Sequence, residues 1–151
     1  MTAFSTSEND RRVSNVLSLG KVTAVHAGSA RADVQVASLA IPNVLVGQLR
    51  AGPLSFWWMP QVGEQVLIGA PSGDLAQAVI LCSIFAGNQP SSDGAVPMID
   101  LDGGKLQING DLEITGGITT TEDVVARTVS LLNHTHGGIV RGGSSTNRPN
   151  Q

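Results

Sequence analysis

Between residues 19 and 85 the chain alternates short apolar-rich segments with turn-forming residues. Within several segments valine or leucine occupies every second position, which is the period of a strand with one buried face. Glycine, proline or aspartate bounds each segment, as in "HAGSA" and "PSGD". We therefore predict five strands, at residues 19–26, 31–38, 43–49, 64–70 and 76–85. Their number and spacing favour an OB-type barrel.

The loop between the third and fourth predicted strands carries Trp57 and Trp58. Adjacent aromatic residues in an apolar loop usually pack, so our first interpretation is that they plug one end of the barrel. Contact with a neighbouring subunit is a second interpretation. A stacking platform for a nucleic acid or glycan is a third, but it would call for more basic residues nearby. Cys82 lies in the apolar run "AVILCSIF" and is expected to be a small core residue.

The apolar pattern changes after a linker at residues 87–97. Leu106, Leu112, Ile118 and Val124 recur every six residues, and a second row begins two residues later with Ile108 and Ile114. Residues at i and i+2 share one face of a strand, so each segment is a very short strand with one apolar side. About 30 residues of this kind cannot form a core alone. Winding with other copies of the chain solves this problem, and a β-meander packed on the barrel is the alternative.

Two histidines, His134 and His136, follow this segment one residue apart. In an extended backbone both side chains project to the same side. Three chains around an axis would bring six imidazoles together in an octahedral site. Zinc suits that site poorly because its structural sites are four-coordinate. Iron, nickel or cobalt fits, and availability favours iron. With every position filled, such a metal is structural. A metal-dependent enzyme that uses the pair with a carboxylate is the alternative.

Composition narrows the choice of function. The net charge is −3 and the nine basic residues are scattered, which argues against nucleic-acid binding. The polar N-terminus lacks the pattern of a signal peptide, and the apolar runs are too short for a membrane helix. The lone cysteine excludes an internal disulfide framework. We therefore expect synthesis in a cytoplasm. The sequence has no nucleophile elbow, phosphate loop or HExxH pattern, so we expect no catalytic activity and no small-molecule substrate.

These patterns divide the chain into five parts. We expect an all-β protein in which an N-terminal OB barrel precedes a short intertwined trimeric β-helix with a metal-capped tip. The expected parts are a flexible N-terminal arm at 1–15, an OB domain at 16–86, a linker at 87–97, the intertwined segment at 98–132, and the part with the two histidines at 133–151.

Three stretches in this order resemble one family. They are the barrel segments with "PQVGEQVL" at 60–67, the repeat "LDGGKLQINGDLEITGGI" at 101–118, and "NHTHGG" at 133–138. The chain resembles the baseplate assembly protein V family, the central tail spikes of contractile-tailed phages and of phage-tail-like bacteriocins. The resemblance spans nearly the whole chain.

The resemblance implies a homotrimer in the virion baseplate. Its OB domains would form a collar at the end of the tail tube and contact the tube and baseplate hub proteins. Its β-helix would taper to a tip where His134 and His136 of three chains hold one iron ion, and residues 139–151 would close the apex. Sheath contraction would drive this tip into the outer membrane of the host. Calcium is a second ion implied for the family, but no residues of this sequence can be assigned to it.

Overall fold

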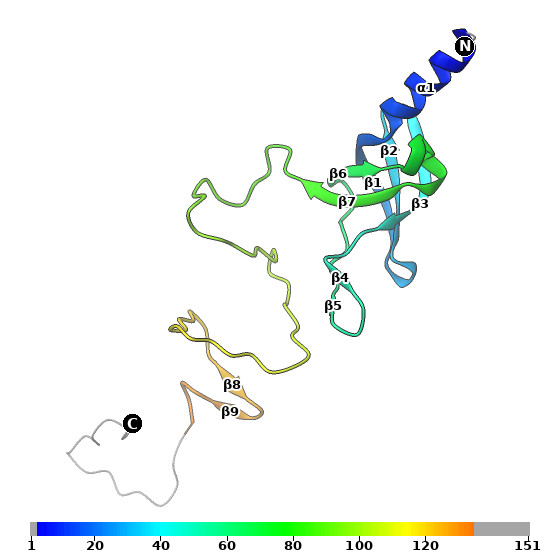
Figure 1. Ribbon diagram of the computed structural model, residues 1–151. Helices are drawn as coiled ribbons and strands as arrows, with labels where there is room; N and C mark the ends of the chain where they lie inside the picture. Colours follow the sequence, from blue (N-terminus) through cyan, green and yellow to red (C-terminus); the bar gives the residue numbers. More distant parts are fainter. Residues whose placement is uncertain (1–2, 135–151) are drawn as a thin grey trace, which may run out of the picture. The chain divides into compact units, whose positions relative to one another are not determined.

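The structure is a computed structural model that describes residues 3–134, and the chain divides into two compact units at Asp100 and Leu101. Figure 1 shows the elements along the chain. The first unit contains one α-helix, seven strands and three short 3-10 helices. Their bounds are α1 (Ala3–Asn15), β1 (Leu17–His26), η1 (Ala27–Ser29), β2 (Arg31–Val36), β3 (Leu39–Val46), β4 (Arg50–Ala51), β5 (Ser55–Phe56), β6 (Gln65–Gly69), η2 (Pro71–Gly73), η3 (Leu75–Gln77) and β7 (Val79–Ile84).

Five of these strands close into a barrel in the order β1-β2-β3-β7-β6. All neighbouring strands are antiparallel except β3 and β7, which are parallel. The closed five-stranded barrel confirms the predicted OB-type fold, and each predicted strand overlaps an observed one. The third strand begins at Leu39 rather than at residue 43, because the β2–β3 turn is short and pairs Leu39 with Val36.

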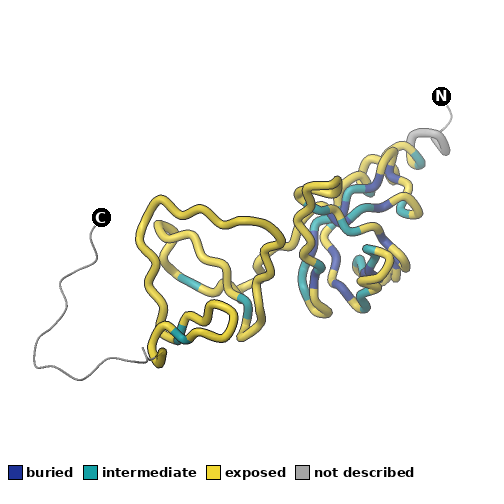
Figure 2. The backbone as a smooth tube through the Cα atoms, turned by 90° about the horizontal axis from the view of Figure 1, so that it is seen from below, coloured by how far each residue is buried: buried dark blue, intermediate teal, exposed yellow. Residues whose placement is uncertain are grey.

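The barrel interior is filled by apolar side chains. Alternate residues of the strands point inward, and their burial is visible as dark blue in Figure 2. The largest fully buried side chains are Val22, Val34, Val66 and Ile68. Gly20 also faces this interior, where an added Cβ would lie 2.5 Å from Cγ1 of Val34 and 2.9 Å from Cδ1 of Ile68. The glycine therefore lets β1 approach the core closely.

The pairing of β6 with β7 contains a bulge that corrects one prediction. Leu67 pairs with Cys82, but the next residue, Ile68, pairs with Ile80, so Leu81 is the extra residue. The bulge turns Leu81 and Cys82 to the outside of the barrel, where both are exposed. The expectation that Cys82 is a core residue is therefore wrong for this chain, because the shifted register reverses the alternation.

The N-terminal segment, expected as a flexible arm, is helix α1 in the structure. Glu8 accepts hydrogen bonds from Arg11 at 2.8 and 2.9 Å and from Arg12 at 2.9 Å, one turn along the helix. These bonds lower the pKa of Glu8 to about 2. The C-terminal turn of the helix packs on η2, where a Cβ on Gly73 would lie 2.1 Å from the carbonyl oxygen of Arg12. The sequence pattern missed this helix because its apolar residues are few.

The predicted linker contains neither helix nor strand in the structure. Its turns are held by side chains that accept from backbone amides two residues away, as Asn88 does from Ala86 at 2.9 Å and Asp93 does from Ala95 at 2.9 Å. These local hydrogen bonds stabilise turns in a polar stretch that has no hydrophobic core of its own.

In the second unit, the described residues 101–134 contain only two short strands, β8 (Val125–Ala126) and β9 (Val129–Ser130), which form a hairpin. Asp102 and Gly103 form a turn with positive φ angles of 47° and 75°, as expected for turn residues. Residues 104–124 contain neither helix nor strand in one chain, so the β-helix remains a prediction.

Candidate functional site

The two apolar rows predicted from the sequence are exposed in the single chain. The six residues Leu106, Ile108, Leu112, Ile114, Ile118 and Val124 are between 45% and 69% exposed. Figure 2 shows almost the whole of residues 101–134 in the colour of exposed residues. Monomeric proteins rarely leave that much contiguous apolar chain in water. The segment therefore has the character of a surface that becomes buried on assembly.

The backbone of this segment forms few internal hydrogen bonds. Within residues 101–134, strand pairing is confined to the β8–β9 hairpin. Three further backbone hydrogen bonds join Gly104 to Leu101, Leu131 to Val124, and His134 to Ser130. Backbone amides and carbonyls are satisfied by other strands or by water. An extended stretch with this few internal bonds can accept strand partners from other chains.

The β8–β9 hairpin is fastened by a carboxylate that the sequence analysis did not select. Asp123 accepts a hydrogen bond from the amide of Leu132 at 3.0 Å, and Ser130 also bonds to its carboxylate. The bond from Ser130 is the largest cause of a lowered pKa at Asp123, and the amide of Leu132 adds to it. The hydroxyl of Ser130 in turn accepts from the amide of Asn133 at 2.7 Å. Asp123 therefore ties the hairpin to the residues just before His134.

His134 lies at the end of the described chain, and its backbone and ring are both oriented by the hairpin. Its amide donates to the carbonyl of Ser130 at 3.2 Å. The ring atom Nδ1 lies 2.9 Å from that carbonyl and 3.2 Å from the carbonyl of Leu131. Because a carbonyl only accepts, Nδ1 is the donor in both contacts. His136, the second predicted ligand, lies outside the described residues.

This arrangement fits a histidine that binds a metal. Metal-ligating histidines usually donate their other ring N–H to a carbonyl or carboxylate, which fixes the tautomer. Within the described residues, no three His, Cys, Asp or Glu side chains gather closely enough to hold an ion. Imidazole ligands suit iron, among other ions.

The tryptophan loop forms a small exposed hairpin of β4 and β5. Trp57 is 59% exposed and Trp58 is 44% exposed, so in the single chain neither plugs the barrel. The ring of Phe56 stacks on that of Trp58 with centroids 6.0 Å apart. Gln48 clamps the loop, because its side chain accepts from the amide of Trp58 at 3.0 Å. The aromatic residues are therefore presented outward, with Arg50 as the nearest basic residue along the chain.

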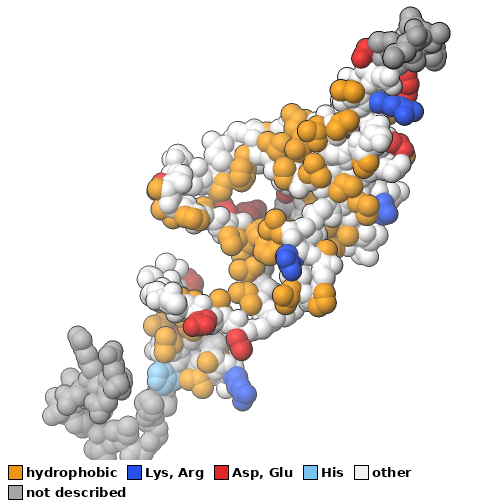
Figure 3. Space-filling model, viewed as in Figure 1, with side chains coloured by type: hydrophobic (Ala, Val, Ile, Leu, Met, Phe, Trp, Pro, Cys, Tyr) orange, Lys and Arg blue, Asp and Glu red, His pale blue; other side chains and the backbone are white. Residues whose placement is uncertain are grey.

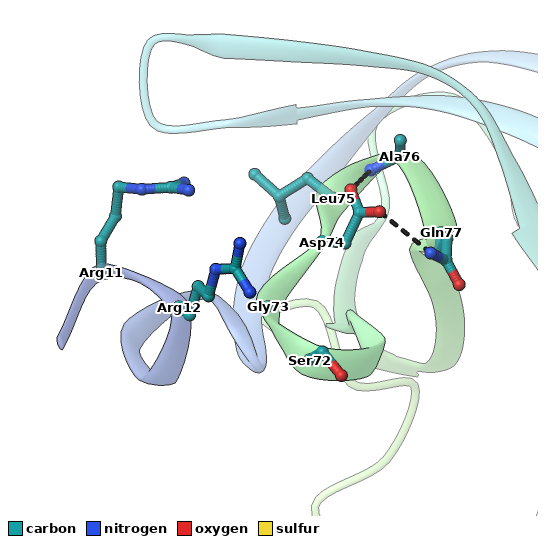
Figure 4. A pocket seen from close by; sticks show the side chains of 8 residues that line it. All are labelled: Arg11, Arg12, Ser72, Gly73, Asp74, Leu75, Ala76 and Gln77. Carbon is teal, nitrogen blue, oxygen red and sulfur yellow. Dashed lines mark hydrogen bonds between the residues drawn. The ribbon is translucent and has the colours of Figure 1, made fainter. Parts of the chain in front are cut away.

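A cleft of about 400 Å³ lies between the end of α1 and the η2–η3 turn. Figure 4 shows Arg11 and Arg12 on one side and Asp74 on the other. The Asp74 carboxylate is already engaged, accepting from the amide of Ala76 at 3.0 Å and from the side chain of Gln77 at 3.0 Å. The two arginines are likewise bonded to Glu8. Because these charged groups bond to other residues of the chain, we interpret the cleft as a packing contact between α1 and the η2–η3 turn.

Comparison with known proteins identifies the barrel. Residues 18–85 match the family model described as the Type VI secretion system/phage-baseplate injector OB domain. This part of the chain is therefore similar to that OB domain. The chain is also 30% identical over 131 residues to the spike protein of Escherichia phage P2. The family resemblance inferred from the sequence is confirmed by both comparisons.

The match to the phage P2 spike protein extends beyond the barrel. It covers 76% of this chain, whereas the barrel match ends at residue 85. The alignment covers 62% of the spike protein, so the chain spans less than two thirds of that relative's length. In the described part of the chain, no helix has the length and apolar character needed to cross a membrane.

Proposed function

We propose that this chain is the structural subunit of a central tail spike in a contractile phage or phage-tail-like particle. Three copies assemble, their segments 98–132 wind into a β-helix, and the spike is pushed into the outer membrane of the host when the sheath contracts. The barrels form a collar that meets the tail tube and the baseplate hub. The particle supplies the driving energy, so the subunit contributes stiffness and no catalysis.

The single observation that carries the proposal is the exposure of the two apolar rows. Their six residues are 45–69% exposed in one chain, although they recur with a regular six-residue period. Three chains wound about one axis would turn the rows inward and would also pair the extended backbones. A closed trimer leaves no long strand edge exposed, which suits a tip that must not fray under load. The similarity to a phage spike protein supports the same architecture.

The apex supports the metal part of the proposal. His134 and His136 of three chains would provide six imidazole nitrogens for one iron ion. Bound there, the ion would link three chain ends at a point where few apolar residues remain, and its binding free energy would add to assembly. The chain itself would orient the His134 ring for metal binding, because the carbonyl of Ser130 lies 2.9 Å from Nδ1 of His134.

Native mass spectrometry of the intact protein tests the proposal. The expected species has three times the 15.6 kDa chain mass and retains one iron ion per trimer. A monomer with one metal per chain would favour the alternative of a metal-dependent enzyme. A metal-free monomer that binds a glycan or nucleic acid, with affinity lost in Trp57→Ala, would favour an OB binding module.

A paired substitution separates the roles of the two units. In a protein with His134→Ala and His136→Ala, the metal should be lost and the apex should fray, while the barrel keeps its circular dichroism and its thermal transition. His26, which lies on β1 and contacts Asp33 at 3.1 Å, provides the control, because His26→Ala should leave the metal content unchanged. Equal metal loss in the control would contradict the assignment.

A further inference from the structure

The outer surface of β1, β6 and β7 is apolar where a free-standing barrel would carry polar residues. Leu17 and Leu19 on β1 point outward and are 57% and 51% exposed, and Leu81 on β7 is 51% exposed. Leu67 on β6 and Cys82 on β7 complete the surface. We call these five residues the leucine wall.

Strand register makes the leucine wall continuous. Directly paired residues share one face of a sheet, and Leu19 pairs with Leu67, which pairs with Cys82. Beside this row, Leu17 pairs with Gly69, and the side chain of Leu81 covers Gly69, whose added Cβ would lie 3.0 Å from Cδ1 of Leu81. Figure 3 shows hydrophobic side chains gathered on the face over β6 and β7.

The leucine wall carries almost no charge, in contrast to the outer face of β2. Lys21, at its margin, is the only Lys, Arg, Asp or Glu in β1, β6 and β7. The strand β2, which does not pair with β6 or β7, presents Arg31, Asp33 and Gln35 on its outer face. The charges of the barrel strands are therefore concentrated on β2, and β3, which exposes Leu39 and Leu45, is uncharged as well. An uncharged, apolar patch of this kind is typical of the buried part of a homo-oligomer interface.

We propose that the leucine wall faces the trimer axis and packs against the barrels of the other two copies, an inference that rests on the proposed trimer. Strand β7 contributes two residues to the wall and runs directly into the linker that enters the segment proposed to wind with the other chains. The wall is thus continuous along the chain with the proposed assembly segment. Around a threefold axis, the same wall of each barrel meets its equivalents, so an uncharged surface encounters no like charge.

The native cysteine provides a direct test, because Cys82 lies on the wall and the chain has no other thiol. The measurement is the rate of maleimide labelling of the full-length native protein. The control is a chain with Cys82→Ser and Ser38→Cys, which moves the thiol to the exposed β2–β3 turn, outside the leucine wall. We expect Cys82 to react at least about tenfold more slowly than the control thiol, since a buried thiol reacts only when the contact opens.

Substitutions at two leucines of nearly equal exposure provide a second test of the wall contact. Leu19 is 51% exposed on the wall, and Leu39 is 49% exposed beside the β2–β3 turn. Leu19→Lys should raise the labelling rate of Cys82 towards that of the control thiol, whereas Leu39→Lys should leave it slow. Neither change removes a buried core side chain, so both variants should fold.

Mass measurement on the same samples distinguishes failure of the wall contact from failure of the proposed trimeric spike. A trimer in which Cys82 reacts as fast as the control thiol would overturn the wall contact and leave the proposed spike intact. A monomer at working concentration would overturn both. A trimer in which Leu19→Lys and Leu39→Lys have equal effects on Cys82 would also refute the wall contact.

Discussion

Cγ1 of Val34 lies 2.5 Å from the position that a Cβ atom on Gly20 would occupy. The same position is 2.9 Å from Cδ1 of Ile68 and 3.2 Å from the carbonyl oxygen of Gln35. Valine has a stiff side chain, so the core cannot yield easily at this point. We expect Gly20→Ala to lower the free energy of unfolding of the barrel by about 1–3 kcal/mol, as measured by chemical denaturation.

Gly28 supplies the matched control for this substitution. It lies in η1, and a Cβ placed on it would have no atom within 4 Å. Gly28→Ala should therefore change the unfolding free energy by only a few tenths of a kcal/mol. If Gly20→Ala were equally harmless, the barrel interior would be looser than its strand register indicates.

Asp33 should make the stability of the barrel depend on acid pH. Its carboxylate accepts from the amide of Asn43 at 2.8 Å and contacts Nε2 of His26 at 3.1 Å, and these two interactions, in that order, lower its pKa. A carboxyl whose pKa is lowered on folding stabilises the fold above its unfolded value and loses this contribution as the pH falls through the folded value. Below about pH 4 the Tm of the native protein should therefore fall more steeply than that of Asp33→Asn. Parallel Tm profiles would contradict this assignment.

The barrel was largely predictable from the sequence, because strand alternation and turn residues are local signals. Its register was less predictable: the bulge at Leu81 depends on the pairing of β6 with β7, and it moved Cys82 from an expected core position to the surface. Helix α1 was missed because its stability comes from the bonds of Glu8 to Arg11 and Arg12 and from packing on η2, and neither feature has an apolar period.

The candidate apex was predictable only in part. The spacing of His134 and His136 is visible in the sequence, but the role of Asp123 is not, because that carboxylate acts on Leu132 and Ser130, which are seven or more residues away. Asp123 directly precedes the apolar pair Val124 and Val125, and this position alone is a weak signal that its carboxylate stabilises a hairpin. The six-residue apolar period is visible in the sequence, but the role of this segment in assembly stays a prediction, because one chain forms no strands over residues 104–124.

Removing one leucine from the apolar rows should weaken the assembly rather than the single chain. Leu112 is 65% exposed in one chain, so Leu112→Ala would cost little if that exposure persisted. Burial of the rows in a trimer would instead make the change cost about 2–5 kcal/mol per chain. The readout is the urea concentration at which the trimer dissociates in analytical ultracentrifugation. Glu113→Ala, at the neighbouring position on the opposite face, should leave this concentration nearly unchanged.

Asp123 should act as a positioning residue for the metal-binding apex. Asp123→Ala removes the acceptor for Leu132 and Ser130, so the backbone that holds His134 becomes less ordered. We expect metal retention against a competing chelator to fall by about tenfold or more, as for other residues that orient metal ligands. Glu122→Ala, one position earlier, is the control and should bind metal normally. Equal retention in both variants would show that the hairpin does not orient the apex.

Hydrogen–deuterium exchange over residues 104–124 tests the central claim most directly. In one chain this segment contains neither helix nor strand, so its amides would exchange within seconds if the protein stayed a monomer. Three wound copies would pair these amides between chains, and we therefore expect protection comparable to that of β1 and β2. Complete, immediate exchange of residues 104–124 alongside a protected barrel would contradict the account.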